Sequence, residues 1–160
     1  MTELSEIHLS RYFDATPAEV YQAFVDPEQL GQWFGPLAYH CPAGEIDVDA
    51  RVGGHWRLMM VANHDHEQRN PVSATLIEVV PDRLLVGYDI VRDFPGLEDG
   101  AKVTMSVELR PEGEGTRLEL RQGPFPEMLI GHASTGWNQS FHKLDGLFAS
   151  PAPFRPGSSS

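Results

Sequence analysis

The last third of the chain has the pattern of one long amphipathic helix that follows a run of strand-like segments, and this order strongly limits the possible folds. The helix is expected over residues 126–149. Its large or apolar side chains recur every three or four residues and form one stripe, made of Leu129, Ala133, Trp137, Phe141, Leu144 and Phe148. Such a stripe must pack on another surface, and the preceding sheet is the only candidate. A curved sheet closed by one long helix generally leaves space between them.

Length and charge limit the domain organisation and the partners. The chain has 160 residues, 41% of them hydrophobic, which suits one domain, expected over residues 6–149. Twelve Lys and Arg against 23 Asp and Glu give a net charge of -11, so nucleic acid and membrane surfaces, both anionic, are not expected partners. The single cysteine, Cys41, cannot form an internal disulfide, and neither a signal peptide nor a membrane-length apolar run is present. We therefore expect a cytoplasmic protein.

Local signals predict a strand at residues 7–14, two short helices and six further strands. Thr16-Pro-Ala-Glu19 supplies an N-cap hydroxyl, a proline at the first helical position and a glutamate that reaches back to the cap. Asp26-Pro27 starts a shorter helix, which ends at Gly35-Pro36. Alternation then predicts strands near 38–48, 53–62, 72–80, 83–91, 102–110 and 116–122. Their close spacing predicts an antiparallel meander, and the Pro-, Gly- and Ser-rich residues 150–160 predict a disordered tail.

This order of elements resembles the START-like, or SRPBCC, superfamily. Its helix-grip fold is an α+β fold in which a curved antiparallel sheet of about seven strands wraps around a long C-terminal helix. Within it, several phrases resemble the family of homologues of the activator of heat-shock protein 90 ATPase: Thr16-Pro-Ala-Glu-Val-Tyr-Gln-Ala-Phe24, Leu30-Gly-Gln-Trp-Phe-Gly-Pro36, Val52-Gly-Gly-His-Trp-Arg57, Leu76-Ile-Glu-Val-Val-Pro-Asp-Arg-Leu84 and Gly136-Trp137. The resemblance covers about residues 6–149. It implies an apolar cavity between the sheet and the helix.

The residues expected to line this cavity are mostly large and apolar. They are Trp33, Trp56, Leu58, Met60, Tyr88, Met105, Trp137 and Phe141, with Asn138 and His142 as polar members. Tyr88 is included because it lies in phase with Leu84, Val86 and Ile90. The same apolar side chains would also simply fill a core, where each buried aromatic contributes roughly 2 to 3 kcal/mol. The sequence leaves both interpretations open.

These residues favour a protein that binds a small, largely apolar molecule, with no cofactor and no catalytic residue. One alternative is an enzyme of the polyketide cyclase or hydrolase type, in which burial shifts the pKa of His142, Asp89 or Glu119. A second, by family analogy alone, is a stress-related chaperone or protein-interaction module. Exposed strand edges would allow a homodimer, which the negative charge opposes unless the contact excludes the acidic patches.

Two further features carry narrower expectations. His64-Asp65-His66-Glu67 is the one cluster of metal-ligand residue types, and a solvated polar turn is preferred there over a labile zinc or nickel site, so no metal is predicted. Gly53-Gly54 predicts a bulge or sharp bend at a strand entrance. Gly136 costs about 1 kcal/mol relative to alanine inside a helix, which predicts that a backbone or a ligand approaches closely there.

Overall fold

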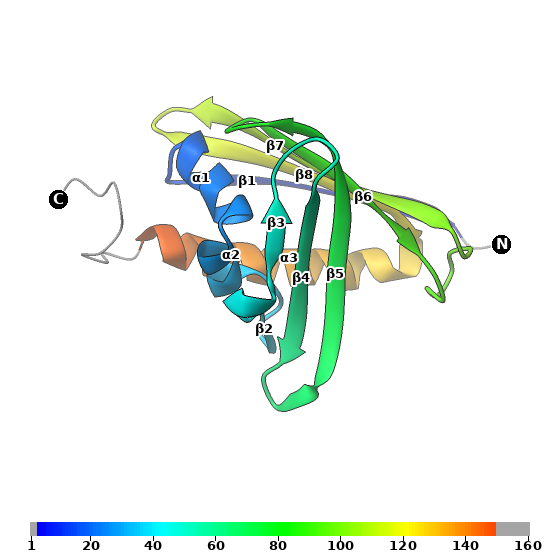
Figure 1. The fold of residues 1–160 in the computed structure, drawn as a ribbon. Helices are drawn as coiled ribbons and strands as arrows, with labels where there is room; N and C mark the ends of the chain where they lie inside the picture. The colour runs from blue at the N-terminus through cyan, green and yellow to red at the C-terminus, as the bar shows by residue number, and fades with distance from the viewer. Residues whose placement is uncertain (1–2, 150–160) are drawn as a thin grey trace.

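The computed structural model describes residues 3–149 and contains one antiparallel sheet crossed by a long C-terminal helix (Figure 1). In chain order the elements are β1 (Leu4–Phe13), α1 (Pro17–Val25), α2 (Pro27–Trp33), β2 (Tyr39–His40), the 3-10 helix η1 (Ala43–Glu45), β3 (Asp47–Asp49), β4 (His55–Ala62), β5 (Asp65–Val80), β6 (Leu84–Val91), β7 (Ala101–Glu112), β8 (Gly115–Pro126) and α3 (Glu127–Ala149). This is the predicted α+β helix-grip fold. The tail predicted over 150–160 lies outside the described residues.

Strands that are neighbours in sequence are mostly neighbours in the sheet. The order is β1-β8-β7-β6-β5-β4-β2, and β3 pairs separately with β4. The meander predicted from the spacing is therefore confirmed from β4 to β8. One predicted strand, over 38–48, is wrong as a single element. The chain turns through η1 directly after Pro42, whose fixed φ and missing N–H do not suit a continuous ladder, so β2 and β3 are separate short strands.

Both short helices begin where the sequence predicts. Thr16 Oγ1 accepts a hydrogen bond of 3.2 Å from the backbone N–H of Glu19, and the Glu19 carboxylate accepts one of 2.9 Å from the backbone N–H of Thr16. This reciprocal pair is a capping box. Asp26 caps α2 by accepting a bond of 3.3 Å from the backbone N–H of Glu28.

The core lies between the three helices and the face of the sheet turned towards them, called the inner face below. The indole N–H groups of Trp33 and Trp56 donate to the carbonyls of Ala23 and Phe24 at 2.9 and 2.7 Å, so both tryptophans are buried with their polar atoms paired. Ring pairs with centroids 4.8 to 6.3 Å apart connect Phe13, Phe24, Trp33, Phe34, Trp56, Trp137, Phe141 and Phe148. Side chains therefore fill the centre of the fold.

The glycine predictions have different outcomes. Gly53 has a φ of 85°, and a Cβ on Gly54 would lie 2.0 Å from the carbonyl oxygen of Asp49, so the predicted bend before β4 requires glycine. At Gly136 the nearest atom is the Pro36 ring carbon, 3.5 Å from where a Cβ would stand, which is an ordinary contact. The expectation of a backbone or ligand at Gly136 is therefore not met among the described residues.

Candidate functional site

Helix α3 is buried unevenly along its length. Its buried residues are Trp137, Ser140, Phe141 and Leu144, and none of residues 127–136 is buried. In that first part Leu129, Ile130 and Ala133 are half-exposed, although they continue the same apolar side of the helix. The predicted stripe is thus confirmed: Ile130 and Ala133 pack against the edge of the core, and full burial begins at Trp137.

The loop after α2 fastens the middle of α3. The backbone N–H of Gly35 donates to Ser140 Oγ at 3.0 Å, and the Lys143 ammonium donates to the carbonyls of Pro36 and Tyr39, each at 3.4 Å. The Pro36 carbonyl also accepts a hydrogen bond of 2.9 Å from the backbone N–H of Tyr39, so Lys143 adds a second bond to it. The loop therefore fixes the buried half of the helix.

A second attachment joins α3 to the edge strand β1. The guanidinium of Arg11 forms an ion pair with the carboxylate of Asp145. The same guanidinium lies 5.6 Å from the ring centre of Phe13 and 6.0 Å from that of Phe141. Both attachments act on the C-terminal half of the helix. At its other end the backbone N–H of Glu127 donates to the carbonyl of Glu3 at 2.8 Å, and Ile130 and Ala133 pack against the core while staying half-exposed.

The inner face of the sheet presents an apolar wall at the boundary between the two halves of α3. Met105 of β7 and Gln122 of β8 are register partners, and Met105 is 5% exposed. Gln122 Oε1 accepts a hydrogen bond of 2.8 Å from the indole N–H of Trp137. Beside Met105, β6 contributes only Gly87, and a Cβ there would lie 3.0 Å from the Cβ of Ala74 in β5. The Leu76 side chain of β5 also lies 3.2 Å from that position, so side chains of β5 occupy the space over Gly87.

Gln122 was not among the predicted site residues. A signal for it was present in β8, because Leu118 and Leu120 alternate with polar residues and place Gln122 on the same face.

Four of the predicted binding residues lie inside the packed core. They are Trp33, Trp56, Leu58 and Phe141, none more than 3% exposed. Met105 and Trp137 are buried where the sheet meets α3, and the half-buried Met60 has its sulfur close to Gly35 in the loop after α2. Asn138 and His142 are exposed on α3. The predicted set is therefore divided between the core, the wall and the surface.

The structure places Tyr88 on the outer face of the sheet. The buried residues of β6 are Leu85 and Gly87, and Tyr88 stands between Thr75 and Thr104 on the opposite face. The Lys102 ammonium lies 4.5 Å from its ring centre. Because β6 carries apolar residues on both faces, alternation alone could not decide which face is inward.

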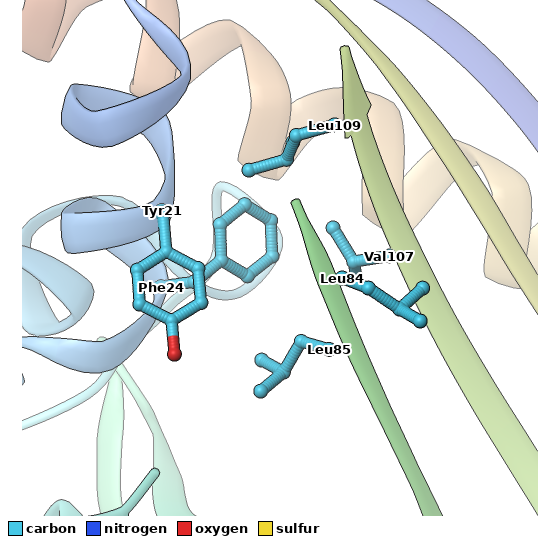
Figure 2. Close-up of a pocket in the computed structure, with 6 residues that line it drawn as sticks. All are labelled: Tyr21, Phe24, Leu84, Leu85, Val107 and Leu109. Carbon is cyan, nitrogen blue, oxygen red and sulfur yellow. The ribbon is translucent and has the colours of Figure 1, made fainter. Parts of the chain in front are cut away.

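A small hollow lies elsewhere, between α1 and the β6–β7 pair (Figure 2). It is lined by Tyr21, Phe24, Leu84, Leu85, Val107 and Leu109, and its volume is about 180 Å³ with part of it open to solvent. Burial and the nearby Asp82 carboxylate raise the pKa of the Tyr21 hydroxyl. No part of it is wide enough to enclose a water molecule, so we interpret this hollow as a gap in packing.

The titratable groups considered for catalysis do not converge. Glu119 lies on the outer face, where His8 and Ser10 donate to its carboxylate at 2.8 and 3.0 Å and lower its pKa. Asp89 and His142 are exposed. Within residues 3–149 no group of three or more metal-ligating side chains is close enough to hold an ion. No helix of this part of the chain is long and apolar enough to span a membrane.

Comparison with known proteins identifies the family. A family model described as activator of Hsp90 ATPase homolog 1-like protein matches residues 14–149. The chain belongs to this family. No curated protein matches the chain in sequence.

Solved structures agree with this membership. A Chromobacterium violaceum protein is 29% identical with a TM-score of 0.76, and the match covers 89% of this chain and 95% of that one. The AHSA1 protein of Silicibacter pomeroyi is 27% identical with a TM-score of 0.72, covering 91% and 98%. A Nitrosomonas europaea protein, at 21% identity and a TM-score of 0.73 over 89% and 92%, supports the fold alone.

Proposed function

We propose that this protein binds a small, largely apolar molecule between the inner face of the sheet and the N-terminal half of α3. One observation carries the proposal: the apolar side of α3 continues through residues 127–136 without a buried residue, although the sheet beside it is apolar. Covering such surface is favourable by about 25 cal/mol per Å². An apolar ligand would supply the cover that the chain itself does not.

Three of the predicted residues are assigned to the ligand contact: Met60, Met105 and Trp137. Methionine side chains adapt to the shape of a ligand, and the Trp137 ring offers a large apolar face. Its N–H already bonds Gln122, so the indole has no free polar atom to attract water. We assign Trp33, Trp56, Leu58 and Phe141 the supporting role of holding this wall from behind.

Binding without chemistry is supported by the kind of residues in the interior. Among residues 3–149 the buried polar side chains are the hydroxyls of Thr116 and Ser140. An acid or base must come within hydrogen-bond reach of the reacting atom, and Glu119 is instead engaged on the outer face. Membership of the family supports the binding role by analogy of fold.

A fluorescence titration with N-phenyl-1-naphthylamine, an uncharged apolar dye, tests the proposal. Ala133→Trp fills the space beside the open half of α3 and should raise the dye's Kd at least about tenfold, or 1.4 kcal/mol. His132→Trp adds the same side chain on the exposed side of the same turn and should leave Kd unchanged. Circular dichroism verifies folding of both variants. Equal dye binding by folded Ala133→Trp and wild-type protein would contradict the proposed site.

A further inference from the structure

The outer face of the sheet carries an apolar patch that the proposed binding site does not use. Val86, Tyr88 and Ile90 of β6 alternate with the inward-facing Leu85 and Gly87. On β5, Ile77 lies in the bulge between Leu76 and Glu78, and Val80 is the register partner of Leu84, next along β6 from Val86 on the same face. Ile77, Val80 and Ile90 are 44%, 44% and 42% exposed. We call these five outward residues the β6 patch. Exposed apolar side chains gathered on one face and rimmed by polar residues, here Glu78, Thr104 and Ser106, are typical of an interaction site.

The neighbouring row on β7 carries opposite charges at its two ends. Lys102 is the register partner of Ile90, and Glu108 is the register partner of Leu84. Both are exposed, and the outward residues between them, Thr104 and Ser106, are neutral. With a rise of about 3.3 Å per residue, the two charges stand about 20 Å apart along the strand.

This row is complementary to itself under a two-fold rotation. Consider a second copy packed face to face, with the axis in the contact plane, perpendicular to β7 and level with Met105. The rotation places β7 opposite β7 and reverses the order of its residues, so Lys102 of each copy faces Glu108 of the other. Packed sheets lie about 10 Å apart, a gap that a lysine and a glutamate reaching from both sides can span.

We propose that this protein forms a two-fold homodimer through the outer face of β5, β6 and β7, with the β6 patch at its centre. Under the same rotation Val86 faces Tyr88 of the second copy. Glu78, the register partner of Val86, comes to lie opposite Thr75 of the second copy. The contact therefore gains two Lys–Glu pairs and brings no two carboxylates opposite each other.

The charge of the chain favours a second copy in this arrangement over unspecific association. A net charge of -11 makes two copies repel each other unless the contact contains positively charged side chains that pair with carboxylates. Lys102 is such a cation, and it lies at one end of the patch, over the ring of Tyr88. A two-fold contact contains each Lys102–Glu108 pair twice, so the dimer gains the energy of two such pairs. The dimer does not depend on ligand binding at α3.

Light scattering coupled to size-exclusion chromatography, with native mass spectrometry, tests the dimer over a micromolar concentration series. The wild-type protein should be dimeric at the upper end. Val86→Asp places a carboxylate in the centre of the contact and should leave a folded monomer by circular dichroism. A wild-type protein that is monomeric at every concentration overturns the proposal. So does a Val86→Asp protein that dimerises as tightly as the wild type, because its dimer would then use another surface.

A charge exchange tests the two-fold register itself. Lys102→Glu and Glu108→Lys should each raise the dimer Kd at least about tenfold, because each places like charges opposite one another twice. The double variant restores both pairs in reverse and should return Kd to within about threefold of wild type. Arg51→Glu, in the turn before β4, is the control: it changes the net charge by the same amount as Lys102→Glu and should leave the dimer Kd unchanged. A double variant no tighter than its single parents overturns the proposal.

Discussion

Trp137 of α3 and Gln122 of β8 are joined by a hydrogen bond of 2.8 Å between the indole Nε1 and the side-chain Oε1. The bond connects helix to sheet at the residue where α3 changes from half-exposed to buried. Trp137 also packs against Phe34 and Phe141, with ring centres 5.5 Å away in both cases. One polar contact thus sets the position of an otherwise apolar side chain.

Replacing Gln122 with leucine should therefore destabilise the protein. The indole N–H of Trp137 would lose its acceptor in a partly buried site, at an expected cost of about 1 to 2 kcal/mol. Urea unfolding of the wild type, Gln122→Leu, Trp137→Phe and the double variant measures this cost as a double-mutant cycle. Because phenylalanine has no N–H to leave unpaired, Gln122→Leu should cost much less in that background. Strictly additive costs would contradict the coupling.

The pair between Arg11 and Asp145 predicts unequal costs for its two partners. The two side chains are 28% and 41% exposed, so the ion pair alone is worth only about 0.5 kcal/mol. The Arg11 guanidinium also lies against the rings of Phe13 and Phe141. Arg11→Ala should thus cost about 1 to 2 kcal/mol, more than Asp145→Ala. Denaturant midpoints compare them, and equal losses would show that the rings contribute nothing.

Local signals were sufficient for the helices. The capping box at Thr16 and the stripe through Trp137, Phe141 and Leu144 depend on residues three or four positions apart, so the sequence alone specifies them. The meander also follows from closely spaced strands and turns. These features, together with the family resemblance, are why the fold could be predicted as a whole.

The site could be predicted less well, because it depends on contacts between distant segments. In β6 both faces are apolar, and only pairing with β5 and β7 decides that Tyr88 points outward. Trp33 and Trp56 have the composition of pocket residues, yet bonds from their indoles to the backbone around α1 place them in the core. Alternation along one strand does not carry that information.

Cys41 should be unreactive in the native protein. Burial raises the pKa of its thiol from 9.0 to about 11, and the nearby Lys143 ammonium opposes this only in part. Near pH 8 the native thiolate fraction is then lower about 100-fold than in the unfolded chain, and alkylation by iodoacetamide should slow at least that much. Labelling with and without urea measures the ratio. Equal rates would show that the thiol is accessible.

The same shift predicts how stability depends on alkaline pH. The unfolded thiol ionises near its usual pKa of 9.0, whereas the native thiol keeps its proton to about 11. Its contribution is therefore present below pH 9 and is lost as pH rises through 11, at most about 3 kcal/mol. Cys41→Ala lacks the thiol, so between pH 9 and 11 the urea midpoint of the wild type should fall relative to that of the variant. A constant difference would contradict the shift.

Glu119 predicts the opposite slope at acid pH. Hydrogen bonds from His8 and Ser10, with Arg110 at 3.3 Å, lower the pKa of its carboxyl in the folded protein. A depressed pKa gives stability that is present above the ordinary carboxyl range and is lost as pH falls through the folded value. The stability difference between wild type and Glu119→Gln, measured by urea unfolding, should thus shrink from neutral pH towards about pH 3. Glu114→Gln, at the exposed tip of the β7–β8 hairpin, is the matched control. If both substitutions give the same pH-independent difference, the network around Glu119 does not contribute to stability.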